Sequence, residues 1–104
     1  MKKYEMYKGE SKVFSLDIEN EPVDADLTIA IVKSNNEIVF SFSTKDGSLF
    51  EQEGSYICEL TSEMSMSIPA STYLIECKIE SASAVTIQQI AELHIKHDTI
   101  YKTN

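Results

Sequence analysis

Apolar and polar residues alternate along almost the whole chain, and this period of two constrains the fold more than any other feature. The alternating apolar positions are Phe14, Leu16, Ile18, Leu27, Ile29, Ile31, Ile38, Phe40, Phe42, Tyr56, Cys58, Leu60, Tyr73, Ile75, Cys77, Ile79, Ala91, Leu93 and Ile95. Successive side chains of a strand point to opposite faces, so strict alternation predicts antiparallel strands with one face in a core and the other in water.

Turn signals separate these apolar runs. Asn35-Asn36 and Asp46-Gly47 suit tight turns because Asn and Gly adopt positive φ, and Glu53-Gly54 is a third candidate. Small polar residues at 81–84 link two long strands. The chain is therefore predicted to form an all-β, antiparallel two-sheet sandwich of immunoglobulin-like arrangement with seven to eight strands, a small barrel being the competing architecture.

One helical turn is expected at 62–66, where Ser62 can serve as N-cap and Met64 can pack inward. A chain of 104 residues and 11.7 kDa buries about two-thirds of its unfolded surface, enough for one core. A single β-sandwich domain is therefore expected over 1–104. Residues 98–104 are expected to form a loose tail or a partner-binding strand.

The charge balance excludes several classes of partner. Nine lysines and no arginine stand against seventeen acidic residues, which gives a net charge of −8. Such a chain has few means of binding nucleic acid or an anionic membrane. No secretory signal and no membrane-spanning stretch is expected, so the chain is predicted to be made in a cytoplasm.

Two cysteines occupy inward positions of predicted strands. Cys58 and Cys77 suggest the inter-sheet disulfide of antibody domains, but the core tryptophan of those domains is missing and no secretory signal is expected. Two buried thiols that act as small apolar residues are the favoured interpretation. A metal role is disfavoured because a tetrahedral site needs further soft ligands.

No catalytic site is predicted. His94 and His97 are three residues apart on a strand and point to opposite faces, so they cannot chelate one ion and are expected to face solvent. No serine or cysteine stands in a context that indicates activation by an imidazole. No cofactor is predicted.

The acidic segment 17–26 is the one charge cluster. Its carboxylates, with Glu19, Glu21, Asp24 and Asp26 as weak candidates, could hold Ca²⁺, although the spacing is not that of the helical calcium loop. A solvated acidic loop is the alternative, and it is the favoured one.

Several residues are candidates for a protein interface. Tyr4, Tyr7 and Tyr101 lie near the ends of the chain, where exposed tyrosines can anchor a partner, although Tyr4 and Tyr7 could equally belong to a first strand. Val39, Ile57 and Leu74 occupy nominally outward strand positions. On one sheet face they would form an apolar patch suited to assembly, unless a second layer or a tail covers them.

The order of these features resembles a family of small β-sandwich modules of tailed phages and prophages, in particular the N-terminal domain of baseplate upper proteins. Six features in chain order carry the resemblance. They are a glycine followed by a strand (8–16), a short excursion that introduces the second strand (22–28), a strand leading to an Asp-Gly turn (38–47), a crossing (60–64), the start of a long strand (68–73) and a closing strand (90–95).

The resemblance implies a structural function: a non-enzymatic tail or baseplate component, made in the bacterial host cytoplasm and then part of the virion. It would bind other virion proteins, with a homo-oligomer possible, through edge strands or outward apolar positions. The net charge of −8 favours a partner that presents lysine or arginine. The alternative is a carbohydrate-binding or adhesin module, with calcium as an optional ligand.

Overall fold

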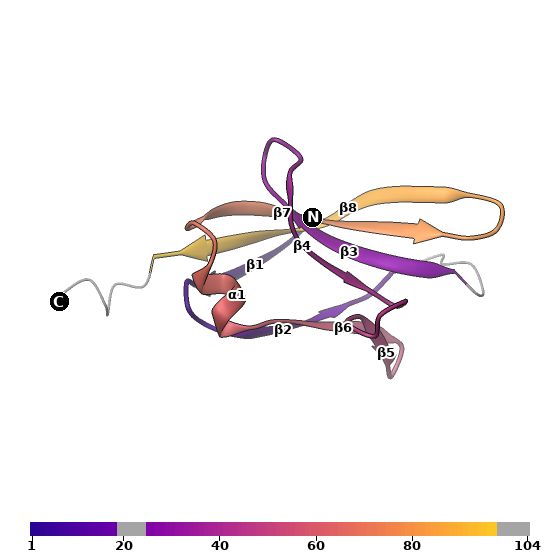
Figure 1. The fold of residues 1–104 in the computed structure, drawn as a ribbon, viewed down its shortest axis with the longest axis horizontal. Helices are drawn as coiled ribbons and strands as arrows, with labels where there is room; N and C mark the ends of the chain where they lie inside the picture. The colour runs from indigo at the N-terminus through magenta and orange to yellow at the C-terminus, as the bar shows by residue number, and fades with distance from the viewer. Residues whose placement is uncertain (19–24, 98–104) are drawn as a thin grey trace.

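The chain folds into two facing β-sheets (Figure 1). The computed structural model describes residues 1–18 and 25–97, so the predicted tail at 98–104 lies outside the described residues. The elements are β1 (Lys2–Tyr7), β2 (Lys12–Leu16), β3 (Asp26–Val32), β4 (Ile38–Ser43), β5 (Phe50–Gln52), β6 (Ser55–Leu60), α1 (Ser62–Met66), β7 (Ser71–Glu80) and β8 (Val85–Lys96). Eight strands and one helical turn over the described residues confirm the predicted all-β class.

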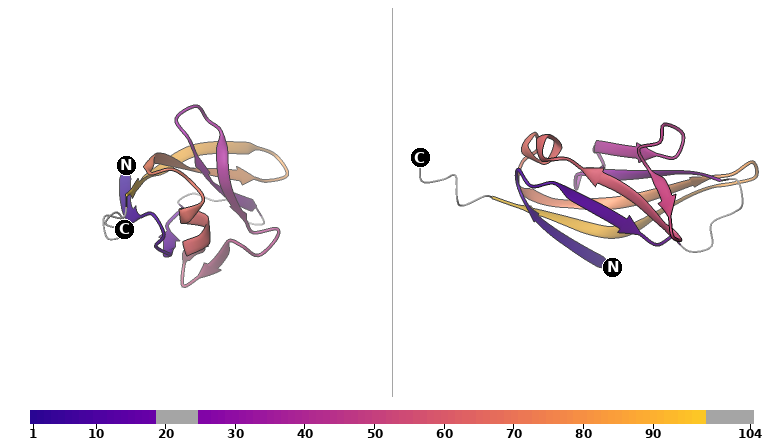
Figure 2. Two further views of the ribbon diagram at one scale, coloured as in Figure 1. Left: turned by 60° about the vertical axis from the view of Figure 1, so that its left-hand side comes forward. Right: turned by 90° about the horizontal axis from the view of Figure 1, so that it is seen from below.

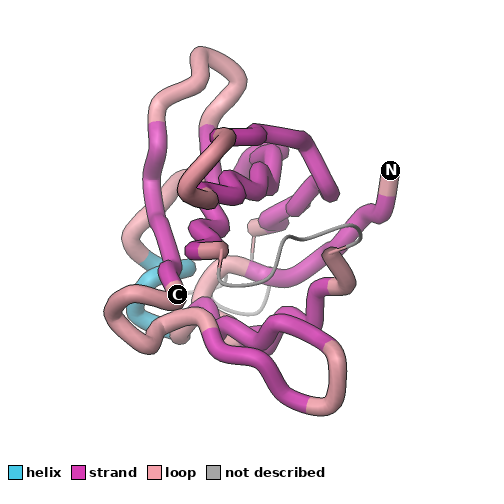
Figure 3. The backbone as a smooth tube through the Cα atoms, turned by 90° about the vertical axis from the view of Figure 1, so that its right-hand side faces the viewer, coloured by secondary structure: helices cyan, strands magenta, loops and turns pink. Residues whose placement is uncertain are grey.

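The larger sheet has the strand order β1-β8-β7-β3-β4, and the smaller sheet has the order β2-β6-β5. The smaller sheet covers one face of the larger one, as the views in Figure 2 show, and α1 lies where the chain crosses from β6 to β7 (Figure 3). The β7–β8 hairpin is longer than the smaller sheet and projects beyond it (Figures 1 and 2).

Among the described strands, all pairs are antiparallel except one. β1 pairs with β8 in parallel register, from Lys2 opposite Ala91 to Tyr7 opposite Lys96. The predicted antiparallel sandwich therefore contains one parallel pair, which the sequence pattern did not indicate. The alternation within each strand does not reveal strand direction, because strands from distant parts of the chain need no hairpin and can pair either way.

The core consists of the inward residues of both sheets. The predicted core positions that are buried are Phe14, Leu16, Leu27, Ile29, Ile31, Phe42, Tyr56, Cys58, Leu60, Tyr73, Ile75, Cys77, Ile79, Ala91, Leu93 and Ile95. Ile18 and Phe40 are partly buried against this core. Ile38 is an exception: it is 61% exposed, whereas Val39 packs against the core. A β-bulge at Ile31/Val32 causes the difference, because it inserts one residue into β4 and reverses the alternation beyond it.

A buried serine joins the helical turn to the turn between β1 and β2. Ser65 is fully buried; its hydroxyl accepts a hydrogen bond from Gly9 N (2.9 Å) and donates toward the carbonyls of Glu10 (2.7 Å) and Ser62 (3.2 Å). Gly9 has φ +94°, and a Cβ there would lie 3.0 Å from Met66 Cε. Glycine is therefore required where the chain passes from one sheet to the other.

The helical turn is at the predicted position but has a different cap. Thr61 is the N-cap and accepts a hydrogen bond from Met64 N, while Ser62 is the first helical residue and donates its hydroxyl hydrogen to Gly9 O (2.6 Å). Ser62 is thus used for tertiary contact rather than for capping. Met64 packs against the core, as predicted.

The two cysteines are buried thiols in opposite sheets, Cys58 in β6 and Cys77 in β7, and they do not form a disulfide. This confirms the favoured interpretation. Burial raises the pKa of the Cys58 thiol from 9.0 to about 12. The neutral thiol is therefore the form that the folded protein holds, and Cys58 acts as a small apolar residue.

Replacing Ser65 with alanine should destabilise the protein by about 2 kcal/mol, because Gly9 N and Glu10 O then lose a buried partner. Urea unfolding measures the loss. Ser67→Ala is the matched control: its hydroxyl makes an exposed bond to Met64 O within the same turn, so a change below about 0.5 kcal/mol is expected. A loss of stability in Ser65→Ala as small as that in Ser67→Ala would show that the Ser65 contacts do not stabilise the protein.

Alkaline pH should destabilise the protein through Cys58. The unfolded thiol ionises from about pH 9 while the folded thiol stays protonated up to about pH 12, so the unfolded state binds fewer protons in that window and stability falls as pH rises. Within that window, this thiol lowers the free energy of unfolding by up to about 1.4 kcal/mol for each pH unit. Urea unfolding of wild type and Cys58→Ala between pH 8 and 11 measures it. Parallel stability profiles of the two proteins would contradict the assignment.

Candidate functional site

In the described part of the chain, the acidic segment forms no metal site. Glu19, Glu21 and Asp24 lie outside the described residues. Asp26 begins β3, and its carboxylate lies 4.0 Å from Lys45 Nζ. Within residues 1–18 and 25–97, no group of three His, Cys, Asp or Glu side chains is placed to hold an ion.

The two histidines are exposed and are not brought together. His94 lies on β8 opposite Glu5 of β1, and His97 follows the end of β8. Both therefore face solvent, as predicted. Glu5 instead forms an ion pair with Lys96 (3.1 Å), which lowers the pKa of its carboxyl and raises the pKa of the Lys96 ammonium.

The two N-terminal tyrosines belong to the first strand but differ in position. Tyr4 packs edge-on against Phe14, with ring centroids 5.0 Å apart, and its hydroxyl oxygen is buried with no hydrogen-bond partner among the described residues. Tyr7 is 47% exposed, with Lys96 Nζ 5.8 Å from its ring centroid. Of these two tyrosines, Tyr4 therefore packs at the edge of the core, and Tyr7 presents its ring to solvent. Tyr101 lies outside the described residues.

The three aliphatic candidates do not share a face. Val39 packs against the core at the bulged edge strand β4. Ile57 is on the outer side of the smaller sheet, opposite Phe50, and Leu74 is on the outer side of the larger sheet, opposite Val32. Alternation assigns inward and outward positions within one strand, but it does not say which sheet that strand joins. The single patch of Val39, Ile57 and Leu74 is therefore not formed.

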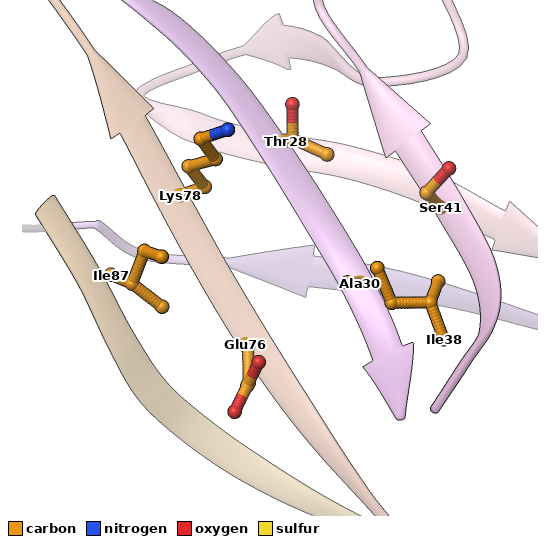
Figure 4. A pocket seen from close by; sticks show the side chains of 7 residues that line it. All are labelled: Thr28, Ala30, Ile38, Ser41, Glu76, Lys78 and Ile87. Carbon is orange, nitrogen blue, oxygen red and sulfur yellow. The ribbon is translucent and has the colours of Figure 1, made fainter. Parts of the chain in front are cut away.

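A different set of residues forms a hollow on the outer face of the larger sheet (Figure 4). Its volume is about 340 Å³, and it crosses β4, β3, β7 and β8. The lining residues are Thr28, Ala30, Ile38, Ser41, Glu76, Lys78 and Ile87. This hollow is the candidate functional site.

The hollow follows from side-chain size and register. Ala30 lies between Ser41 of β4 and Glu76 of β7, so short side chains line the surface of β3 and β4 there. Ile38 and Ile87, 61% and 63% exposed, stand at its two sides in Figure 4. Two apolar walls over a small-residue floor can receive an apolar side chain from a partner.

The charges in the hollow come from β7. Glu76 and Lys78 project from alternate positions of this strand, and Lys78 Nζ lies 3.7 Å from a carboxylate oxygen of Glu80. Glu76 makes no ion pair within 4.0 Å among the described residues. The hollow therefore offers one carboxylate to a cationic group of a partner.

Sequence reasoning missed this site for two reasons. The bulge turns Ile38 outward against its alternation, and the floor consists of residues too small to attract notice. One signal was available: Val85 and Ile87 stand in a stretch, 81–91, that contains no charged residue in a chain of net charge −8.

No helix in the described part of the chain is long and apolar enough to cross a membrane.

Comparison with known proteins gives likeness of fold only. No family model matches the chain, and no curated protein matches it. The second Ig domain of the mouse polymeric immunoglobulin receptor is similar at 11% identity and a TM-score of 0.55, covering 94% of this chain and 96% of that one. CopC from Methylosinus trichosporium OB3b is similar at 14% identity and a TM-score of 0.53, covering 93% and 86%.

A chain of the ZIG-8-RIG-5 IG1-IG1 heterodimer is similar at 10% identity and a TM-score of 0.50, covering 90% of this chain and 81% of that one. At such low identities these likenesses speak for the fold and not for a shared activity. Together with the two facing sheets, they confirm the predicted architecture: the chain is an immunoglobulin-like β-sandwich.

Proposed function

We propose that this chain is a non-enzymatic structural module of a phage or prophage, a tail or baseplate component that acts by protein–protein assembly. The observation that carries the assembly part is the hollow of the larger sheet, where Ile38 and Ile87 are exposed around a floor of small side chains. Exposed apolar groups with a polar surround are typical of protein interaction sites. The resemblance of the feature order to baseplate upper proteins supports the virion setting.

The chemistry of the hollow favours a protein partner over a sugar. Sugar-binding sites commonly stack an aromatic ring on the sugar, and none of the described residues that line this hollow is aromatic. Its apolar surface is aliphatic, which suits an apolar side chain of a partner. Glu76 and the net charge of −8 favour lysine or arginine beside that side chain.

The candidate reactive groups also favour a binding module over an enzyme. Cys58 is buried, and at neutral pH its raised pKa keeps it in the protonated, unreactive form. The two histidines are exposed at positions that bring neither of them to the hollow. The proposed action therefore needs only complementary surfaces.

If the hollow binds a virion protein, Ile38→Lys should weaken that binding at least about tenfold, because it places an ammonium group in the apolar wall. The partner is sought among the products of neighbouring genes, and the purified proteins are tested one by one by biolayer interferometry. Val13→Lys is the matched control: Val13 is 59% exposed, close to the 61% of Ile38, but lies on the smaller sheet.

The expected result is a tail or baseplate protein that binds wild type and Val13→Lys alike and binds Ile38→Lys weakly. Equal loss in both variants would place the interface elsewhere. Neighbouring genes without any tail component, together with no binding by their products, would overturn the virion assignment.

A further inference from the structure

We propose that the first half of β8, residues 85–89, is an open sheet edge on which two copies of this chain pair, strand to strand. This inference concerns the edge of the larger sheet and does not depend on what the hollow binds. It rests on four observations: the pairing partners of β8, the direction of its main-chain groups, its exposure and its lack of charge.

β8 has a neighbour on both sides along only part of its length. On one side it pairs with β7 from Val85 to Ile95. On the other side β1 begins with Lys2 opposite Ala91 and runs toward Lys96. Residues 85–89 therefore lie beyond the start of β1, and in the described part of the chain no strand pairs with that side of them.

The main-chain groups of alternate residues point to this open side. Ser81 N donates to Ala84 O (2.9 Å), which makes these two residues the first hydrogen-bonded pair of the β7–β8 hairpin. Hydrogen-bonded and non-hydrogen-bonded pairs alternate along an antiparallel ladder, so Val85, Ile87 and Gln89 do not bond to β7. Each of the three presents one N–H and one C=O to the open edge.

Nothing on the segment protects this edge. All five residues of 85–89 are exposed, Val85 by 59% and Ile87 by 63%, because the hairpin projects beyond the smaller sheet (Figure 1). Val, Thr and Ile favour strands, and no residue of 81–91 is charged or is proline. Edge strands in monomeric proteins usually carry charges, prolines or covering loops.

The other edges of the two sheets carry such protection. β1 has Lys2, Lys3 and Glu5, β2 has Lys12, and β5 has only three residues, one of them Glu51. At β4 the loop that follows the strand covers the end of the edge: Leu49 N donates to Ser43 O, and Ser43 N donates to Ser48 Oγ. Among the described strands, each of the other edges therefore has a charge, a cover or a very short length that the open part of β8 lacks.

The occupant that we infer is a second copy of this chain, because the main-chain groups of the segment are complementary to themselves. In an antiparallel arrangement about a two-fold axis at Ile87, Ile87 pairs with Ile87 of the second copy and Val85 pairs with Gln89. Every outward N–H then meets an outward C=O. Thr86 lies opposite Gln88 on the other face, so no like charges meet at the joint although each chain carries −8. The two larger sheets become one continuous sheet.

Sedimentation equilibrium from micromolar to millimolar concentration tests this pairing. Wild type should form a dimer with increasing concentration. Ile87→Pro removes one outward N–H from each copy without removing a bond to β7, so dimerisation should weaken about 30-fold or more. Ile87→Val keeps the N–H and a β-branched side chain, and it should dimerise like wild type. Circular dichroism and the melting temperature verify that each variant is folded.

The Ile38→Lys variant distinguishes pairing at the β8 edge from association through the hollow. It alters the hollow but not β8, so it should leave the dimer intact. A dimer that Ile38→Lys abolishes and Ile87→Pro preserves would overturn the edge pairing, and so would a wild type that stays monomeric up to millimolar concentration. Neither result depends on the binding of a virion partner.

Cross-linking tests the register independently of Ile87. Thr86 and Gln88 of two copies form a non-hydrogen-bonded pair, whose Cα atoms lie about 4.5 Å apart and within the range of a disulfide. A mixture of Thr86→Cys and Gln88→Cys should yield a mixed disulfide dimer on mild oxidation, whereas each variant alone should yield little. Equal yields in all three samples would contradict the proposed register.

Discussion

The passage of the chain from one sheet to the other depends on the hydroxyl of Ser65. β1 belongs to the larger sheet and β2 to the smaller one, so the turn between them must cross the core edge without leaving polar groups unpaired. The Ser65 hydroxyl accepts a hydrogen bond from Gly9 N and donates toward Glu10 O. The helical turn that carries Ser65 is itself a second connection between the sheets, from β6 to β7. A second bond, from the Tyr73 hydroxyl to Pro69 O, fixes the start of β7 after this crossing. These part-buried hydrogen bonds link the two layers at one end of the sandwich.

The functional proposals for this chain concern its surface and not its interior. The buried thiol of Cys58 has a pKa of about 12, and the exposed histidines stand apart from the hollow. The larger sheet also carries exposed apolar residues, among them Ile38, Val85 and Ile87, which are not part of the core. A face with a hollow and an edge without charge are the features on which the proposed assembly rests.

Alternation was sufficient to predict the sandwich and most of its core. The inward sets that include Leu27, Ile75 and Leu93 are all buried, because a period of two leaves one choice of face once a second layer exists. It failed where the period is interrupted: the bulge in β4 exchanges Ile38 and Val39 between core and surface. The candidate patch failed for a related reason, since Ile57 and Leu74 belong to different sheets and strand order is set by long-range pairing. The hollow could not be predicted because it results from the juxtaposition of four strands.

The parallel pairing of β1 with β8 determines how the molecule bears tension. Lys2 lies beside Ala91 at one end of this pair, and Lys96 lies beside Tyr7 at the other. A force that draws Lys2 and Lys96 apart therefore acts along both strands, and it loads all six register pairs at once in shear instead of opening them one after another. Pulled along this axis, β1 and β8 can separate only if all of these pairs yield together.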